Sequence, residues 1–215
     1  MTITRRFFYI TVLPAVLFIL CSCAGKQSAQ PELILLSKEE VLLRLSSSMP
    51  EACEYLGRTS IQFADNRNRK NIRAILDKSC SGDMDIKILG PFGIQMAEIL
   101  VSGNEYAIFQ NGKNVTAKYP INIDAADIVL LKNYLTLPPP LPDERYTFIS
   151  NTNQYIFTLE DEYISVTPDL YVNNIFRDDH EVYYLWKEGV LKAIRFFRND
   201  AEVVVEFIDP WKEKK

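Results

Sequence analysis

Strict alternation of apolar and polar residues is the feature of this sequence that most constrains its fold. Near the C-terminus, Ala201–Ile208 places Glu202 and Glu206 on one side of a strand, opposite four apolar residues, Ala201, Val203, Val205 and Phe207. Earlier in the chain, charged and apolar residues alternate in the order Asp83, Met84, Asp85, Ile86, Lys87 and Ile88. Because successive side chains of a strand point to opposite faces, this spacing predicts half-buried strands of an antiparallel sheet.

Turn residues separate further segments of this kind, and we expect about ten strands in all. Besides the two above, the expected strands are Tyr55–Ala64, Ile72–Asp77, Ile94–Val101, Tyr106–Gln110, Val115–Tyr119, Tyr146–Ser150, Gln154–Leu159, Tyr163–Val166, Val182–Lys187 and Val190–Arg198. Ser37 and Glu40 form a capping box, which predicts a short helix to about Ser47. Helical spacing predicts a second helix over Asp124–Tyr134, before the proline-rich connector Leu137–Pro142.

These elements predict a mainly β (α+β) fold. We expect a single curled antiparallel sheet that forms an open half-barrel of about ten strands, with two or three covering helices. A curled sheet with one apolar face either fills that face with its own side chains or holds a ligand there. The helix after Asp124 is a candidate lid or plug for this face.

The N-terminus has the pattern of a secretion signal. Arg5 and Arg6 precede an apolar run, Phe7–Leu20, which is too short for a bilayer core of about 30 Å but matches a signal peptide. The run ends in Leu20-Cys21-Ser22-Cys23, which resembles the lipobox of bacterial lipoproteins. The resemblance implies that residues 1–22 are a cleaved lipoprotein signal peptide and that Cys23 carries the lipid. A secreted soluble protein or a buried apolar helix is the alternative.

Lipidation of Cys23 would anchor the protein to a membrane through a small, polar tether over residues 23–36. Ala24, in place of the aspartate that commonly retains such lipoproteins in the inner membrane, favours the periplasmic face of the bacterial outer membrane. Cleavage leaves 193 of the 215 residues and, since Arg5 and Arg6 are lost, a side-chain charge of −6. This negative charge argues against nucleic acid as a partner.

The sequence offers little material for catalysis. It contains one histidine, and its eight glycines form neither of the common phosphate-binding motifs. We therefore expect no catalytic residue, metal or cofactor, and no enzymatic activity. Asp178-Asp179-His180-Glu181 is interpreted as a solvated loop rather than an acid–base or metal site. Asp83 and Asp85 are interpreted as outer-face residues rather than a cation site.

Two cysteines remain in the domain once Cys21 and Cys23 are assigned to the signal and the lipid. A two-residue turn at Asn66-Arg67 pairs the flanking strands so that Cys53 lies opposite Cys80. In an oxidising compartment this register predicts a cross-strand disulfide, and two buried free thiols remain the alternative.

The order of these elements resembles the LolB family, outer-membrane lipoproteins that receive other lipoproteins from the periplasmic carrier LolA. The most specific match is the loop Gly90-Pro91-Phe92-Gly93 between two strands. The resemblance implies a half-barrel domain over residues 37–215 that binds acyl chains in an apolar cavity. It further implies a monomer, a LolA-like carrier as partner, and a loop of Pro91, Phe92 and Gly93 whose apolar residue engages the membrane.

The candidate lining of the cavity comes from the two strands that flank this loop. The candidates are Met84, Ile86, Ile88, Ile94 and Met96, and an ordinary packed core is the alternative for each. Glu98 is either an exposed edge residue or a polar group at the mouth of the cavity. Two functions are therefore compared: a LolB-like receptor for acyl chains, and an accessory outer-membrane lipoprotein of the same fold that binds a protein partner or another lipid.

Overall fold

The computed structural model describes residues 35–49, 52–64, 69–118, 125–199 and 201–211. All of them belong to one compact unit that begins at Leu35. The signal segment, Cys23 and most of the tether lie outside the described residues, as do the turn at Asn66-Arg67 and the start of the helix predicted from Asp124.

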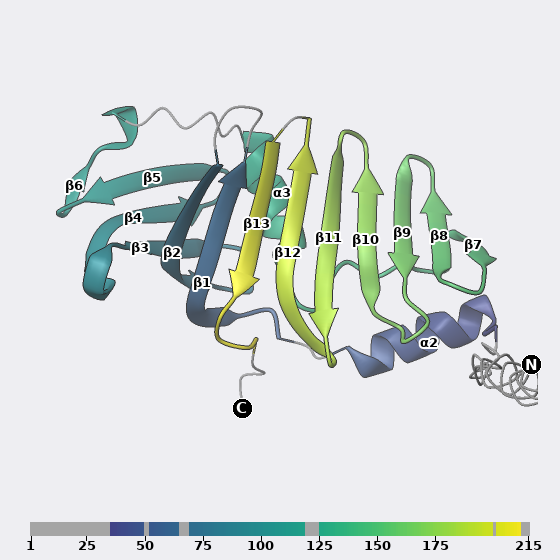
Figure 1. The fold of residues 1–215 in the computed structure, drawn as a ribbon. Coiled ribbons are helices and arrows are strands. Elements are labelled where there is room, and N and C mark those ends of the chain that lie inside the picture. Colours follow the sequence, from purple (N-terminus) through teal and green to yellow (C-terminus); the bar gives the residue numbers. More distant parts are fainter. Residues whose placement is uncertain (1–34, 50–51, 65–68, 119–124, 200, 212–215) are drawn as a thin grey trace, which may run out of the picture. The chain divides into compact units, whose positions relative to one another are not determined.

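A single antiparallel sheet of 13 strands makes up most of this unit (Figure 1). The first six strands are β1 (Tyr55–Ala64), β2 (Arg69–Lys78), β3 (Met84–Leu89), β4 (Gln95–Ser102), β5 (Glu105–Gln110) and β6 (Lys113–Asn114). The other seven are β7 (Thr147–Ser150), β8 (Tyr155–Leu159), β9 (Glu162–Val166), β10 (Val172–Arg177), β11 (His180–Lys187), β12 (Val190–Arg198) and β13 (Ala201–Phe207). The sheet is curled and open, so the predicted fold class is confirmed, with more strands than expected.

The strand order consists of two meanders joined in the middle. It reads β6-β5-β4-β3-β2-β1-β13-β12-β11-β10-β9-β8-β7, so sequence neighbours pair everywhere except at β1 and β13. These two strands pair over six residue pairs, from Thr59 opposite Phe207 to Ala64 opposite Glu202. The first and last strands of the domain are therefore central, and β6 and β7 form the two edges.

Two α-helices accompany the sheet in the described part of the chain. The first, α2 (Lys38–Ser48), begins with the predicted capping box, in which the Glu40 amide donates to Ser37 Oγ and the Ser37 amide donates to Glu40 Oε2. It buries Val41 and Leu45. The second, α3 (Ala125–Tyr134), connects the two edges of the sheet, and the Tyr184 hydroxyl of β11 donates to the Tyr134 carbonyl at its end.

One strand assignment from the sequence is wrong, and one strand was not predicted. The segment predicted as Val115–Tyr119 is no strand where it is described, because β6 ends at Asn114 and a 3-10 turn, η2 (Thr116–Lys118), follows. The Asn114 side chain accepts from the Thr116 amide at 3.0 Å, which turns the backbone away from the ladder. Strand β10 was not predicted, because Asn173 and Asn174 interrupt its apolar pattern.

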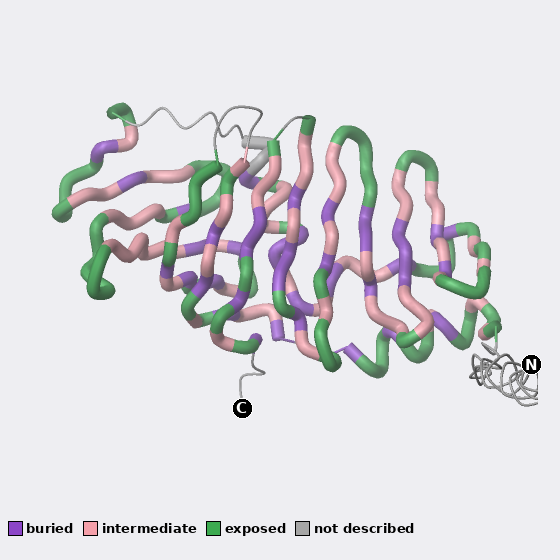
Figure 2. The backbone as a smooth tube through the Cα atoms, in the orientation of Figure 1, coloured by how far each residue is buried: buried purple, intermediate pink, exposed green. Residues whose placement is uncertain are grey.

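Buried residues alternate along the strands and define an inner face, the face whose side chains pack with those of α2 and α3 (Figure 2). Most of its completely buried members come from β8 to β12. They are Tyr155, Phe157, Ile164, Val166, Val172, Ile175, Val182, Tyr184, Leu191 and Ile194, each no more than 1% exposed, and Ala74 and Leu76 of β2 are buried to the same degree. This half of the inner face is filled by the chain's own side chains.

Ile164→Ala should therefore lower the free energy of unfolding by about 2–5 kcal/mol, since it leaves a cavity in this core. Ile149→Ala is the matched control, because Ile149 lies two strands away in β7 and is 59% exposed. That change should stay within about 0.5 kcal/mol. Denaturant titration followed by circular dichroism measures both, and equal losses would contradict the burial described for Ile164.

Candidate functional site

The loop between β3 and β4 presents the most exposed large apolar side chain in the described part of the chain. It forms a 3-10 turn, η1 (Pro91–Gly93), closed by a bond of 2.8 Å from the Gly90 amide to the Ile94 carbonyl. Phe92 at its tip has a relative accessibility of 101%, and Ile94 is 65% exposed. The loop thus holds an aromatic ring fully in solvent.

The backbone of Phe92 is in the left-handed region, with φ 60° and ψ 16°. For a bulky residue this conformation is an outlier that costs on the order of 1 kcal/mol or more. Since the ring is fully exposed, the fold gains no packing energy from it in return. The residue is therefore better explained by what the ring contacts outside the protein than by the stability of the fold.

Met96 contacts the other side of the loop. A Cβ on Gly90 would lie 2.2 Å from Met96 Sδ and 2.6 Å from Met96 Cγ, so the methionine side chain lies directly over the glycine backbone. The Met96 side chain remains 51% exposed. Gly90 is thus required by a close approach, and the Met96 side chain of β4 adds exposed apolar surface at the base of the loop.

Strand β3 places three of the predicted cavity residues on the inner face. Met84, Ile86 and Ile88 of β3 pair with Val101, Ile99 and Ala97 of β4, respectively, and paired residues share a face. Exposure rises along this row: Met84 is 3% exposed, whereas Ile86 and Ile88 are half-buried. An apolar strip therefore runs from the core toward the exposed loop, where Ile94 and Met96 lie.

Glu98 does not belong to this strip. The register pairs it with Lys87, on the face opposite to Ile86 and Ile99. Lys87 in turn forms an ion pair of 3.0 Å with Asp85 on the same face. The interpretation of Glu98 as a polar group at the mouth of an inner-face cavity is therefore wrong, since strand alternation sends its side chain to the other side of the sheet.

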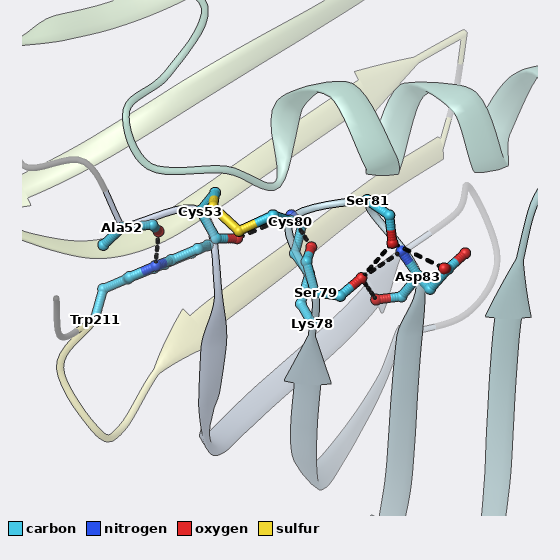
Figure 3. Close-up of a disulfide and its surroundings, with 8 residues drawn as sticks. All are labelled: Ala52, Cys53, Lys78, Ser79, Cys80, Ser81, Asp83 and Trp211. Atoms are coloured by element: carbon cyan, nitrogen blue, oxygen red, sulfur yellow. Dashed lines mark hydrogen bonds between the residues drawn. A yellow bond between two sulfur atoms is a disulfide. The ribbon is translucent and has the colours of Figure 1, made fainter. Parts of the chain in front are cut away.

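Cys53 and Cys80 form a disulfide at the end of the β1–β2 hairpin, with a Cα–Cα distance of 4.8 Å (Figure 3). The strand register, from Tyr55 opposite Lys78 to Ala64 opposite Arg69, is the one that the two-residue turn predicts. Next to the disulfide, Trp211 Nε1 donates to the Ala52 carbonyl. This bond ties the C-terminal segment to the residue before Cys53.

Lys78, beside this disulfide, is a buried charged residue that the sequence interpretation missed. It is 2% exposed, and Figure 3 shows it next to Ser79 and the disulfide. Alternation along β2 contained the signal, because Ala74, Leu76 and Lys78 occupy the same face. A lysine that continues an apolar row marks a position where a charge is buried.

The acidic segment around the single histidine does not converge on one point. Asp179 accepts from Arg198 Nε at 3.1 Å, and this bond lowers the pKa of the carboxyl. His180 packs against the Tyr134 ring, and burial lowers its pKa. Glu181, the next residue in β11, instead accepts from Asn174 and Tyr183 on the opposite face. Among the described residues, no group of three or more such side chains could hold a metal ion.

The aspartates at the start of β3 are also engaged separately. Asp83 accepts from Ser81 Oγ at 2.8 Å, and this bond lowers the pKa of the carboxyl. Asp85 instead forms an ion pair with Lys87.

Within the residues that the structure describes, no helix has the length and apolarity needed to cross a membrane.

Comparison with known proteins gives distant structural likenesses only. No family model matches the chain, and no curated protein matches it. A LolA superfamily protein of Nitrosomonas europaea is 11% identical in sequence, with a TM-score of 0.47. The structural match covers 84% of this chain and 94% of that protein. A DUF1329 family protein of Desulfovibrio piger is 11% identical with a TM-score of 0.40, and the match covers 80% of this chain and 90% of that protein. A candidate outer membrane lipoprotein-sorting protein domain of Vibrio parahaemolyticus is 7% identical with a TM-score of 0.43, and the match covers 80% of this chain and 90% of that domain. At identities and TM-scores this low, a function for this chain has to rest on its own residues.

Reduction of the Cys53–Cys80 disulfide should lower the free energy of unfolding by about 3–4 kcal/mol, given a sequence separation of 27 residues. The double variant Cys53→Ala/Cys80→Ala should unfold like the reduced protein and should not respond to reductant. Thermal unfolding with and without reductant measures the effect. Titration of two free thiols in the unfolded, unreduced protein would contradict the disulfide.

Proposed function

We propose that this protein is a lipid-anchored lipoprotein of the bacterial outer membrane that accepts acyl chains, free or carried by other lipoproteins, and passes them into that membrane. The observation that carries the proposal is Phe92, fully exposed on a strained loop of a chain whose residues 20–23 resemble a lipobox. Burying one phenylalanine side chain in an apolar phase contributes about 1.5–3 kcal/mol. A bilayer held close by the lipid on Cys23 would supply that phase.

The apolar strip supports the second part of the proposal. It runs from Met84 through Ile86 and Ile88 toward the loop, where the exposed Met96 side chain lies over Gly90. An acyl chain needs only such a lining, at about 0.8 kcal/mol for each methylene buried, and no catalytic group. Transfer then requires only that the acyl chain has a higher affinity for the membrane than for the protein.

One observation favours the accessory role instead. The inner face of β8 to β12 is completely filled, with Phe157, Ile164 and Tyr184 all 0% exposed. In the β1–β5 half, Ala74 and Leu76 are also buried, and the half-buried Ile86 and Ile88 of β3 are the inner-face positions that we propose for a ligand. Depletion of the protein, followed by cell fractionation, separates the two functions. A receptor predicts that another lipoprotein accumulates in the periplasm on its carrier, whereas normal distribution of lipoproteins would favour the accessory role.

Cys23→Ser should abolish lipid attachment and leave an unprocessed precursor, because a hydroxyl replaces the thiol that the lipid modifies. Membrane fractionation and the mass of the N-terminal peptide measure the result. Cys21→Ser is the control, since that cysteine lies within the proposed signal peptide, and it should still be processed. A Cys23→Ser protein with an acylated mature N-terminus would refute the lipobox.

Phe92→Glu should leave thermal stability unchanged within about 0.5 kcal/mol, because the ring makes no packing contact that the change could remove. It should nevertheless reduce delivery of acyl-chain cargo from the protein to vesicles, since a carboxylate is disfavoured in the bilayer. Phe92→Leu should retain delivery. Ile149→Glu, an exposed position on the distant edge strand β7, is the control for an added charge.

The two measurements separate membrane contact from a structural role. Loss of stability in Phe92→Glu would show that the ring supports the fold. Undiminished delivery by a stable Phe92→Glu protein would show that the loop does not contact the membrane during transfer.

A further inference from the structure

Lys78 lies within an apolar row of the inner face. It is the last residue of β2, and the register places it between Tyr55 of β1 and Met84 of β3, with Val101 of β4 next in the row. These three neighbours are 2%, 3% and 7% exposed, and Lys78 itself is 2% exposed. A strand position with this environment ordinarily carries an apolar side chain, because burying a charge is costly.

The ammonium group of Lys78 has fewer partners than it has donors. Its Nζ donates to the Ser79 carbonyl at 3.1 Å and to the Cys53 carbonyl at 3.3 Å. An ammonium group carries three N–H donors, so one is left over by these two bonds. In the described part of the chain, no carboxylate forms an ion pair with it. The positive charge is therefore held by backbone dipoles alone.

A second lysine adds to the positive charge at this position. The side chain of Lys132, from α3, passes over the β2–β3 turn, where a Cβ on Gly82 would lie 2.8 Å from Lys132 Cε. Its Nζ donates to the Gly103 carbonyl at 2.9 Å and lies 3.9 Å from Asp83 Oδ1, a half-exposed carboxylate. Burial and this neighbouring cation both lower the pKa of Lys78. Two cations thus lie near each other here, and Asp83 forms an ion pair with Lys132.

We propose that Lys78 binds the anionic head, a carboxylate or a phosphate, of an acyl-chain lipid whose chain lies along the apolar strip toward the Phe92 loop. The proposal rests on the proposed function and specifies its ligand. An anion next to Lys78 would take up the unused donor and neutralise a buried charge that otherwise destabilises the protein.

The dimensions of the strip agree with this ligand. Strand β3 starts at Met84, beside Lys78, and ends at Leu89, before the loop. At about 3.3 Å per residue, its six residues span about 20 Å. One leaflet of a bilayer core of about 30 Å gives its acyl chains a length of about 15 Å. A single chain therefore fits between the buried cation and the exposed loop.

Competition for a neutral fluorescent probe, a pyrene-labelled hexadecanol, tests the proposal on the detergent-purified mature protein. The competitors are palmitate, hexadecyl phosphate and hexadecanol, which share a chain and differ in the charge of the head. The affinity of the wild-type protein for palmitate or hexadecyl phosphate should exceed its affinity for hexadecanol by a factor of about ten or more. Inorganic phosphate alone should not displace the probe.

Lys78→Met should remove this preference and leave hexadecanol affinity unchanged, because methionine keeps the apolar stem and lacks the charge. Lys113→Met, at an exposed position of β6, is the matched control and should keep the preference. Thermal unfolding accompanies each variant. If Lys78→Met does not fold, Lys132→Met supplies the test, with an expected loss of about threefold in palmitate affinity, since it removes the neighbouring positive charge.

The outcomes distinguish the two proposals. Binding of hexadecanol without a preference for either anionic lipid would overturn the role of Lys78 and leave acyl-chain binding intact. If neither the probe nor any of the three lipids binds the protein, both proposals are overturned. Displacement by inorganic phosphate would replace the lipid head with a free anion as the ligand and so overturn the proposal.

Discussion

The pairing of β1 with β13 is the interaction on which the rest of the structure depends. Each meander can form from local hairpins, but these two strands are about 150 residues apart in sequence and join the meanders into one sheet. One end of this seam is reinforced. Asp209 accepts from the Arg58 guanidinium at 2.8 Å, and the rings of Tyr55, Phe207 and Trp211 pack with centroids 4.9–5.0 Å apart. The disulfide fixes the next strand pair at the same end.

The central seam also determines what covers the inner face. Because β1 and β13 lie in the middle, β6 and β7 lie at opposite edges, and the chain between them has to pass from one edge to the other. Helix α3 belongs to this connection. Its contacts fall on both halves: Tyr134 accepts from Tyr184 of β11, and Lys132 lies over Gly82 of the β2–β3 turn. The position of α3 over the inner face therefore follows from strand order, and its own apolar residues adapt to that position.

Local chemistry made part of this structure predictable. The capping box at Ser37 fixes where α2 begins, and a short turn fixes the β1–β2 register and with it the position of Cys53 opposite Cys80. What could not be predicted depends on partners distant in sequence. Asn174 is buried in β10 because Glu181 of the neighbouring strand accepts from it, and Glu98 faces away from the strip because its register with Lys87 sends it there. Alternation shows that a strand has two faces, but only the partner strands decide which face is buried.

Two of the described residues that depart from the local rules of a sheet lie beside β3. At its start, Lys78 places a charge in an apolar row, and beyond its end Phe92 exposes a ring on a left-handed backbone. Neither arrangement stabilises the fold, since one buries an unpaired cation and the other strains a turn without packing in return. The apolar strip runs along β3 between them. A lipid molecule compensates both features at once, because its charged head pairs with a buried ammonium group and its membrane surrounds an exposed aromatic ring. A protein partner would have to meet these opposite demands at sites about 20 Å apart along one strand, which makes the lipid the simpler ligand.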